Sequence, residues 1–219
     1  MRPEREGAVR AAGGAQRPFS VLLVCTGNIC RSPLAEAALQ RGLADYGREQ
    51  EPPLGPASIT VTSAGTRAEP GAQSPDDAKT TARRSGLDLD AHRARKLTAG
   101  LLAESDLVLG LDRSHRRAVV SLAPRASRNT FTLLEFARVC DSLAPSEVSE
   151  LREAAPDGPA RLRAAVATVA ALRGTLPAAA DELDVPDPYR RGLTAYEVSS
   201  AAVLSACEVI TRFFTRLND

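Results

Sequence analysis

Two residues that can do chemistry lie close together near the start of the chain, in the segment VLLVCTGNICRSP. Cys25 offers a sulfur nucleophile, and Arg31 follows it with the spacing Cys-x5-Arg. A guanidinium can hold two oxygens of a tetrahedral oxyanion in a bidentate fork. Its charge also stabilises a thiolate, which is the reactive form of cysteine. This spacing therefore predicts a nucleophile beneath a cradle for an anion.

The elements on either side are suited to position this pair. The apolar run FSVLLV over 19–24 predicts a buried parallel strand, and Ser32-Pro33 predicts the start of a helix. A short loop between them would aim backbone N–H groups and the positive end of the helix dipole at one point. Gly27 leaves room for the backbone to curl, Asn28 tolerates left-handed geometry, and Ser32 can donate to the sulfur.

The alternative interpretation is structural: Cys25 would be a small core residue at the end of a strand. Cys-x5-Arg alone is common by chance. The combination of strand, cysteine, Gly-Asn, Arg-Ser-Pro and helix is much more specific, so we favour the chemical interpretation.

The rest of the chain alternates between strand and helix patterns. Further strands are expected at 58–65 and 106–111, and 129–134 is a short fourth strand or a strand-to-helix junction. Between them we expect a first helix that ends at Gly47, and helices that begin at Ser74, Thr98 and Asp112 as caps. The prediction is an α/β fold, a three-layer doubly wound sheet of four parallel strands flanked by helices, with the loop between strand 1 and helix 1.

The C-terminal part predicts one long amphipathic helix that covers the sheet. Thr194 and Glu197 have the spacing of a capping box. The residues after them place one apolar face at helical spacing, made of Tyr196, Val203, Cys207, Ile210, Phe214 and Leu217.

The length of 219 residues suits a single domain, which we expect over 18–219. Residues 1–17 are polar and rich in Gly and Ala, so they predict a disordered tail. Residues 140–184 contain few large apolar side chains and four prolines, and they predict an inserted helical hairpin. This insertion is a candidate for controlling access to the site or the choice of partner.

Composition narrows the function further. Lys and Arg number 28 against 27 Asp and Glu, so the net charge of +1 argues against a nucleic-acid binder. No run approaches the roughly 20 apolar residues that span a bilayer, and the start lacks an apolar signal region. We therefore expect a cytoplasmic protein without membrane insertion. Four cysteines do not make a secreted disulfide framework, and the Arg/Ala bias indicates a GC-rich bacterial genome.

Five segments together resemble one family. CTGNICRSPLAEAAL (25–39) resembles the phosphate loop and first helix of the low-molecular-weight protein tyrosine phosphatases, in a bacterial, actinobacterial-type form. TSAGT (62–66), AHRAR (91–95), DLVLGLD (106–112) and DPY (187–189) resemble later family segments in the same order. The resemblance covers roughly 18–138 and 185–217.

The resemblance implies a two-step phosphatase mechanism that uses no metal and no other cofactor. Cys25 would attack phosphorus to form a cysteinyl-phosphate, while Asp187 would protonate the leaving group and then activate water. Arg31 and the loop amides would stabilise the phosphoryl oxygens. The substrate would be a phosphotyrosine-containing protein or a small aryl phosphate, and a bacterial tyrosine kinase is one partner of this kind. Taken alone, Asp187 in an Asp-Pro pair would be an ordinary turn residue.

The same resemblance assigns supporting roles. Ser63 and His92 would support the loop through Asn28. Tyr189 would form a pocket wall, although it could also simply pack under the last helix. The residues expected to bind the phosphate or substrate are Thr26, Gly27, Asn28, Ile29, Cys30, Ser32 and Tyr189.

Several interpretations stay open at this stage. Cys30 is either a loop filler or the partner of Cys25 in a reversible, protective disulfide. His115 is expected to face solvent, and Arg190-Arg191 is either a solvated pair or an attractor of acidic peptides. Ile29 stands where the related protein-arginine phosphatases carry threonine, and an apolar side chain there suits an aryl ring. Against this, residues 67–71 lack the aromatic side chain that often forms the opposite wall, and Arg190 replaces a more usual aromatic residue or glycine.

Two other functions compete with the phosphatase. An arsenate reductase of the same fold needs two further, closely spaced cysteines, whereas Cys140 and Cys207 lie far apart and are expected in helix cores. A non-catalytic phosphate-binding regulator would not need Cys25, Arg31 and Asp187 together.

Overall fold

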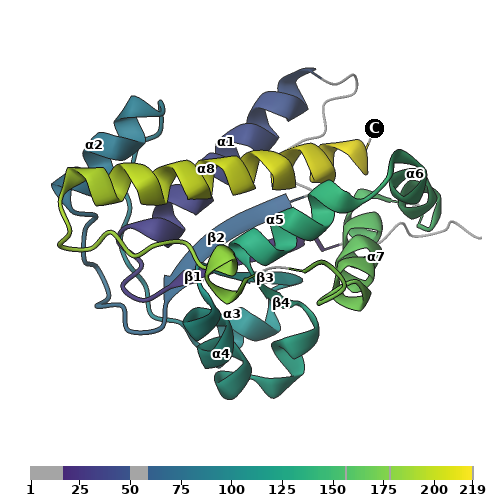
Figure 1. The fold of residues 1–219 in the computed structure, drawn as a ribbon, viewed down its shortest axis with the longest axis horizontal. Helices are drawn as coiled ribbons and strands as arrows, with labels where there is room; N and C mark the ends of the chain where they lie inside the picture. Colours follow the sequence, from purple (N-terminus) through teal and green to yellow (C-terminus); the bar gives the residue numbers. More distant parts are fainter. Residues whose placement is uncertain (1–16, 50–58, 156, 178, 219) are drawn as a thin grey trace, which may run out of the picture.

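The computed structural model describes residues 17–49, 59–155, 157–177 and 179–218. Four parallel strands form one sheet in the order β2-β1-β3-β4, with helices on both faces (Figure 1). This confirms the predicted fold class. The strands are β1 (Phe19–Cys25), β2 (Ile59–Gly65), β3 (Leu107–Gly110) and β4 (Thr130–Thr132).

The central strand β1 is buried almost throughout, as its continuous apolar sequence predicts. Its last residue, Cys25, pairs in register with Gly65 at the end of β2. The residue before it, Val24, pairs with Gly110 at the end of β3. The carboxyl ends of three strands therefore meet at one edge of the sheet, where the loop after β1 begins.

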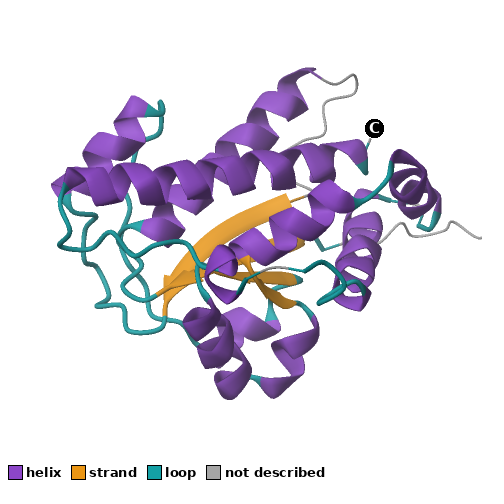
Figure 2. Cartoon of the chain, in the orientation of Figure 1, coloured by secondary structure: helices purple, strands orange, loops and turns teal. Residues whose placement is uncertain are grey.

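Two layers of helices enclose the sheet (Figure 2). One layer contains α1 (Arg31–Glu49), α5 (Leu133–Ser142) and α8 (Leu193–Arg216), and α2 (Asp76–Arg84) packs beside α8. The other layer contains α3 (Ala99–Ala103), α4 (Arg113–Leu122) and the 3₁₀ helix η1 (Pro124–Arg128). The buried side chains form a large cluster under the first layer and a smaller one under the second.

The helix α8 supplies much of the larger cluster. All six apolar residues predicted for its inner face are buried. The ring of Phe214 lies 5.7 Å from that of Phe19 and 6.2 Å from that of Phe136, both edge-on. Among the described residues α8 is the one helix long and apolar enough to cross a membrane by length and composition. Its packing against α1, α2 and α5 accounts for that composition within the fold.

Two helices, α8 and α2, do not begin with the caps that the sequence predicts. The expected capping box of Thr194 and Glu197 does not form, because α8 begins at Leu193 after Gly192, whose φ is 78°, and Thr194 already lies inside the helix. Glu197 forms an ion pair with Arg84 of α2 instead. Ser74 does not cap α2 either: Pro75 is the residue before the helix, and the buried Ser74 hydroxyl has no hydrogen-bond partner.

Other helix boundaries agree better with the sequence prediction. Thr98 caps α3, and Asp112 caps α4 by accepting from the N–H groups of Ser114 and His115. The helix α1 runs to Glu49, so Gly47 lies inside its last turn rather than ending it. Without a positive φ at this position, the backbone continues in the helix.

The segment 140–184 contains two helices of its own, α6 (Pro145–Glu153) and α7 (Gly158–Ala171), followed by the 3₁₀ helix η2 (Ala180–Leu183). The Arg163 side chain on α7 donates to the carbonyl oxygen of Arg17, just before β1, and pairs with Asp106 before β3. The helices α6 and α7 therefore lie at the amino ends of the strands, away from the loop after β1 (Figure 1). Residues 1–16 of the predicted tail lie outside the described residues.

Phe214→Ala tests the packing of α8. Removing a fully buried ring that touches three other rings should lower the free energy of unfolding by about 3–5 kcal/mol. Urea denaturation measures this change. Val198→Ala on the same helix is the matched control, because Val198 is 56% exposed and its loss should change stability by less than about 0.5 kcal/mol. Equal effects of both substitutions would contradict the proposed role of α8 in the core.

Candidate active site

The loop after β1 curls around one buried residue, Asn28. Its φ of 53° is left-handed, as its residue type allows, and its side chain is fully buried. The amide nitrogen donates to the hydroxyl oxygens of Ser63 at 2.7 Å and Ser32 at 2.9 Å. The amide oxygen accepts from the backbone N–H of Arg95 at 2.9 Å. All three partners lie on different elements, so this side chain ties the loop to the fold.

A second set of contacts holds those partners. His92 Nε2 donates to the carbonyl oxygen of Asn28 at 2.7 Å. The Ser63 hydroxyl donates a hydrogen bond to the Glu36 carboxylate, 2.5 Å away on α1, and the Ser63 carbonyl oxygen accepts from Arg95 Nε. The structure thus brings Ser63 and His92 to Asn28, where the sequence placed them. Glu36 and Arg95 were not expected there.

Cys25 lies at the base of the curl. Its sulfur accepts from the backbone N–H of Asn28 at 3.2 Å and lies 3.0 Å from the hydroxyl oxygen of Ser32. Because that oxygen already accepts from the Asn28 amide, the Ser32 proton is free to point at the sulfur. Both contacts place a donor hydrogen, with its partial positive charge, against the sulfur.

The loop closes tightly against the second strand. A side chain on Gly65 would meet the carbonyl oxygen of Thr26 at 2.6 Å and the backbone nitrogen of Asn28 at 2.9 Å. Only glycine therefore fits at the end of β2, in the middle of the TSAGT segment. The close approach is fixed by hydrogen bonds from the N–H groups of Thr66 and Arg67 to the carbonyl oxygens of Cys25 and Thr26.

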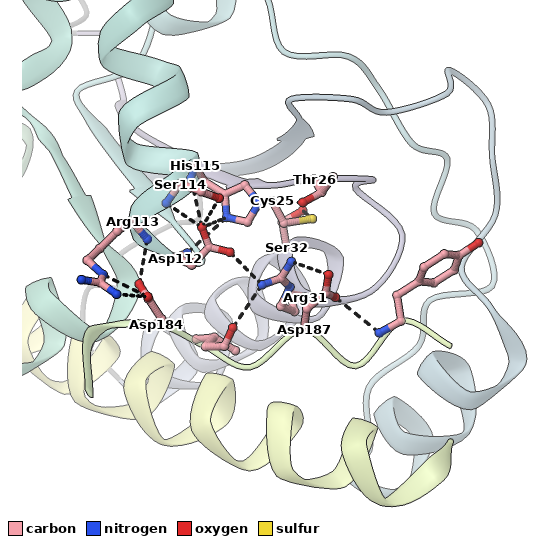
Figure 3. Close-up of polar contacts among 12 residues, drawn as sticks. Cys25, Thr26, Arg31, Ser32, Asp112, Arg113, Ser114, His115, Asp184 and Asp187 are labelled. Atoms are coloured by element: carbon pink, nitrogen blue, oxygen red, sulfur yellow. Dashed lines mark hydrogen bonds and ion pairs between the residues drawn. The ribbon is translucent and has the colours of Figure 1, made fainter. Parts of the chain in front are cut away.

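Arg31, the first residue of α1, is only 4% exposed and is held by oxygen atoms (Figure 3). Its Nη1 donates to Asp112 Oδ2 at 3.0 Å and to the Val185 carbonyl oxygen at 3.1 Å. Its Nη2 lies 3.2 Å from Asp187 Oδ2. The two bonds at Nη1 do not involve the edge formed by Nε and Nη2, which can hold two oxygens of an oxyanion with the Asp187 carboxyl beside it.

The position of His115 corrects the sequence prediction. It was expected to face solvent, but it is 1% exposed and lies between the loop and Asp112. In the neutral ring, the backbone N–H of Asp112 donates to His115 Nδ1 at 3.2 Å, and Nε2 donates to Thr26 Oγ1, 2.9 Å away. In the protonated ring, Nδ1 donates instead to Asp112 Oδ1 at 3.0 Å. The residue completes the capping box of α4, which is why a histidine in a basic helix points inward.

Asp112 connects this histidine to Arg31. Burial opposes its ionisation, but the hydrogen bonds from His115 and Ser114 outweigh burial and hold its pKa well below the usual range. The carboxylate is therefore charged at neutral pH and can orient the guanidinium. The sequence identified Asp112 only as a helix cap. Its position directly after a buried strand, at the edge of the sheet where the loop lies, could have indicated that it also contacts Arg31.

Asp187 and Tyr189 approach the loop from the segment between η2 and α8. Tyr189 donates its backbone N–H to Asp187 Oδ1 at 3.3 Å. Tyr189 is 44% exposed and does not pack beneath α8, so that alternative is wrong. Arg190 and Arg191 are both exposed, and the Arg190 guanidinium lies 5.1 Å from the centre of the Tyr189 ring.

These groups line one cavity of about 490 Å³. The loop and the start of α1 contribute Cys25, Ile29, Cys30 and Arg31, and the segment 184–192 between η2 and α8, called the acid segment below, contributes Asp187 and Tyr189. The segment after β2 contributes no aromatic side chain; its lining residues are Arg67, Glu69, Ala72, Gln73 and Pro75. Among the described residues that line the cavity, none belongs to 140–184, so the insertion does not form its entrance.

The other cysteines differ from Cys25. All four are free, and the sulfur of Cys30 lies 3.6 Å from the hydroxyl of Tyr196. Burial raises the pKa of the Cys30 thiol to about 12, although the hydrogen bond with Tyr196 partly opposes this shift. Burial also raises the pKa values of Cys140 and Cys207, which lie in the cores of α5 and α8. Neither is placed to relay a disulfide to Cys25.

The fold and the loop together define an α/β phosphatase architecture, and comparison with known proteins gives the family. The model of the family described as low molecular weight phosphotyrosine protein phosphatase matches residues 20–150. The chain therefore belongs to this family and is a phosphoric monoester hydrolase.

Individual relatives agree with this assignment. The chain is 26% identical over 178 residues to a probable low molecular weight protein-tyrosine-phosphatase EpsP of Ralstonia nicotianae, covering 81% of this chain and 83% of the relative. It is 34% identical to a protein-arginine-phosphatase of Geobacillus stearothermophilus, covering 54% and 72%. The crystal structure of the low molecular weight protein tyrosine phosphatase from T. tengcongensis superimposes with a TM-score of 0.61 at 25% identity, covering 89% of this chain and 98% of the other.

Thiol labelling tests how different the cysteines are. At pH 7, iodoacetamide should modify Cys25 first, because burial raises the pKa values of the Cys30, Cys140 and Cys207 thiols and keeps them protonated. Peptide-mapping mass spectrometry identifies the modified residue. Inorganic phosphate should slow the reaction at Cys25, and labelling of Cys30 should become faster as the pH rises toward its pKa of about 12. Faster labelling of Cys30 than of Cys25 at pH 7 would contradict this description of the site.

Proposed function

We propose that the protein hydrolyses phosphotyrosine in proteins through a covalent phosphoryl group on Cys25. The observation that supports this most is the meeting of Cys25, Arg31 and Asp187 in one cavity, from segments more than 150 residues apart. A simple phosphate-binding regulator has no use for a carboxyl group 3.2 Å from the anion-binding guanidinium. A nucleophile, an oxyanion clamp and a proton donor are the three parts that this chemistry requires.

In the first step the Cys25 sulfur attacks phosphorus in line, and the bond to the tyrosine oxygen breaks. Asp187 in its protonated form transfers a proton to that oxygen, so a neutral phenol leaves. In the second step Asp187, now ionised, takes a proton from water, whose oxygen attacks phosphorus and releases the sulfur. The Nε and Nη2 edge of Arg31 and the amides of the curled loop stabilise the equatorial oxygens in both steps.

The walls of the cavity support an aryl substrate. Ile29 is partly buried, lines the cavity and offers an apolar surface, and Tyr189 of the acid segment lines the same cavity. Two observations suit a phosphoguanidinium: Glu69 also lines the cavity, where a carboxylate can pair with a guanidinium, and one relative is a protein-arginine-phosphatase. We favour phosphotyrosine because Ile29 and Tyr189 can both contact an aromatic ring in the cavity that contains Cys25.

A panel of phosphopeptides tests this choice. Phosphotyrosine peptides should be turned over, while phosphoserine peptides should not, because a short side chain cannot bring its phosphate down to Cys25. The phosphoarginine peptide should be a poorer substrate than phosphotyrosine. Cys25→Ser should abolish turnover and keep phosphate binding in isothermal titration calorimetry. A preference for phosphoarginine would contradict the proposed substrate, and turnover by Cys25→Ser would contradict the proposed mechanism.

Asp187→Asn tests the proton donor. The amide cannot transfer a proton, so kcat/KM for phenyl phosphate should fall by about 10²–10⁴-fold. The value for p-nitrophenyl phosphate should fall much less, because nitrophenolate leaves without protonation. Steady-state kinetics with both esters gives the two ratios. If Asp187→Asn matched the wild type on phenyl phosphate, the assignment of the acid would be wrong.

A further inference from the structure

The N-terminal end of α4 holds two carboxylates that come from different parts of the chain (Figure 3). The N–H groups of Ser114 and His115 donate to Asp112 Oδ1 at 2.8 and 3.1 Å. The N–H of Arg113 donates to Asp184 Oδ1 at 2.8 Å. The first N–H groups of a helix have no partner within it, and the helix dipole favours anions there. Both carboxylates are therefore drawn to one point.

The bond to Asp184 is reinforced by a side chain. Arg113 Nε and Nη2 donate to Asp184 Oδ2 at 3.0 and 2.8 Å. One residue thus supplies three bonds to one carboxylate, two from its guanidinium to Oδ2 and one from its backbone N–H to Oδ1. Because both carboxylate oxygens are held, the contacts fix the orientation of the carboxylate as well as its distance. Asp184 is the residue at which the chain leaves the 140–184 insertion.

The two residues after Asp184 are also restrained, and they connect it to the active site. Val185 is 1% exposed, and its N–H donates to the carbonyl oxygen of Leu111, which directly precedes Asp112, at 2.9 Å. The carbonyl oxygen of Val185 accepts from Arg31. Pro186 restricts the backbone before Asp187. Only two residues therefore separate Asp184 from the proposed acid, and both are restrained.

We propose that Asp184 and Arg113 are a positioning pair: they anchor the acid segment to the N-terminal end of α4 and so hold the Asp187 carboxyl over the cavity that contains Cys25. The inference rests on the proposed function, because it needs Asp187 as the proton donor. The anchor is shared with Asp112, so α4 places both the clamp Arg31 and the acid Asp187.

The exposure of the pair favours a positioning role over a stabilising one. The Arg113 and Asp184 side chains are 44% and 29% exposed, and ion pairs in such positions add little to stability. Proton transfer is far more sensitive, since the acid must lie within hydrogen-bond reach of the leaving oxygen. A shift of about 1 Å in such a group can cost up to about 10²-fold in rate.

Kinetics with two esters separates positioning from folding. Asp184→Ala should lower kcat/KM for phenyl phosphate by at least about 10-fold and that for p-nitrophenyl phosphate by less than about 3-fold, because only the first leaving group needs the proton. Phosphate affinity, measured by calorimetry, should not change. Equal losses on both esters together with weaker phosphate binding would reduce the pair to a structural contact and overturn the proposal.

A double variant tests whether Asp184 acts through Asp187. In the Asp187→Asn background, Asp184→Ala should cause no further loss on phenyl phosphate, since two residues that act through one step are not additive. Additive losses would contradict the proposal. Arg113→Ala removes two of the three bonds but keeps the backbone donor, so it should give a smaller shift in the same ratio. It is the variant to use if Asp184→Ala does not fold, and an unchanged ratio would again overturn the inference.

Glu182→Gln is the matched control. Glu182 precedes Asp184 by two residues and forms an exposed ion pair with Arg138, 3.3 Å apart. Its loss should leave both esters at wild-type rates, and a shifted ratio there would contradict the specific role of Asp184. If Asp187→Asn itself behaves as wild type, the acid assignment falls and this inference with it. If Asp187→Asn is slow while Asp184→Ala is unchanged, this inference alone fails.

Discussion

The curled loop between β1 and α1 depends on the hydrogen bonds of a single buried side chain. A left-handed residue between a buried strand and a helix turns the loop N–H groups inward, and Asn28 adopts that conformation with every side-chain polar atom bonded. Its partners come from α1, from β2 and from the segment before α3. An apolar replacement would leave the buried N–H of Arg95 without a partner, which costs roughly 1–3 kcal/mol. The shape of the anion site is thus built into the fold before any substrate arrives.

The parallel sheet explains why these segments can meet. The carboxyl ends of β1, β2 and β3 lie at one edge, so the residues after each strand converge although they are far apart in sequence. Cys25 ends β1, Gly65 ends β2 against the loop, and Asp112 follows β3. The acid segment joins this edge through Val185 and Asp184, which bond to the residues around Asp112. Cys25, Arg31 and Asp187, the proposed nucleophile, clamp and acid, are therefore held at one edge of the sheet.

Much of this arrangement could be predicted from the sequence. Strong local signals were sufficient for the alternation of strands and helices and for Asn28 in the left-handed region, and the family resemblance implied that Ser63 and His92 support it. Features that depend on tertiary neighbours could not be predicted in this way. The sequence pattern of Thr194 and Glu197 fits a capping box, but Arg84 on another helix takes the glutamate. His115 sits in a basic stretch, yet Thr26 and Asp112 draw it inside. The insertion was suspected of guarding the cavity, whereas its helices lie at the opposite end of the strands.

Phosphoryl transfer to Cys25 is the central step of the proposed mechanism, and trapping the phosphorylated cysteine tests it most directly. The enzyme is mixed with a phosphotyrosine peptide, quenched with denaturant within the first turnover, digested and examined by mass spectrometry. We predict a phosphoryl group on the peptide that contains Cys25, appearing as the dephosphorylated product forms. Product formation in the first turnover without any adduct, or with the adduct on a different residue, would contradict the account.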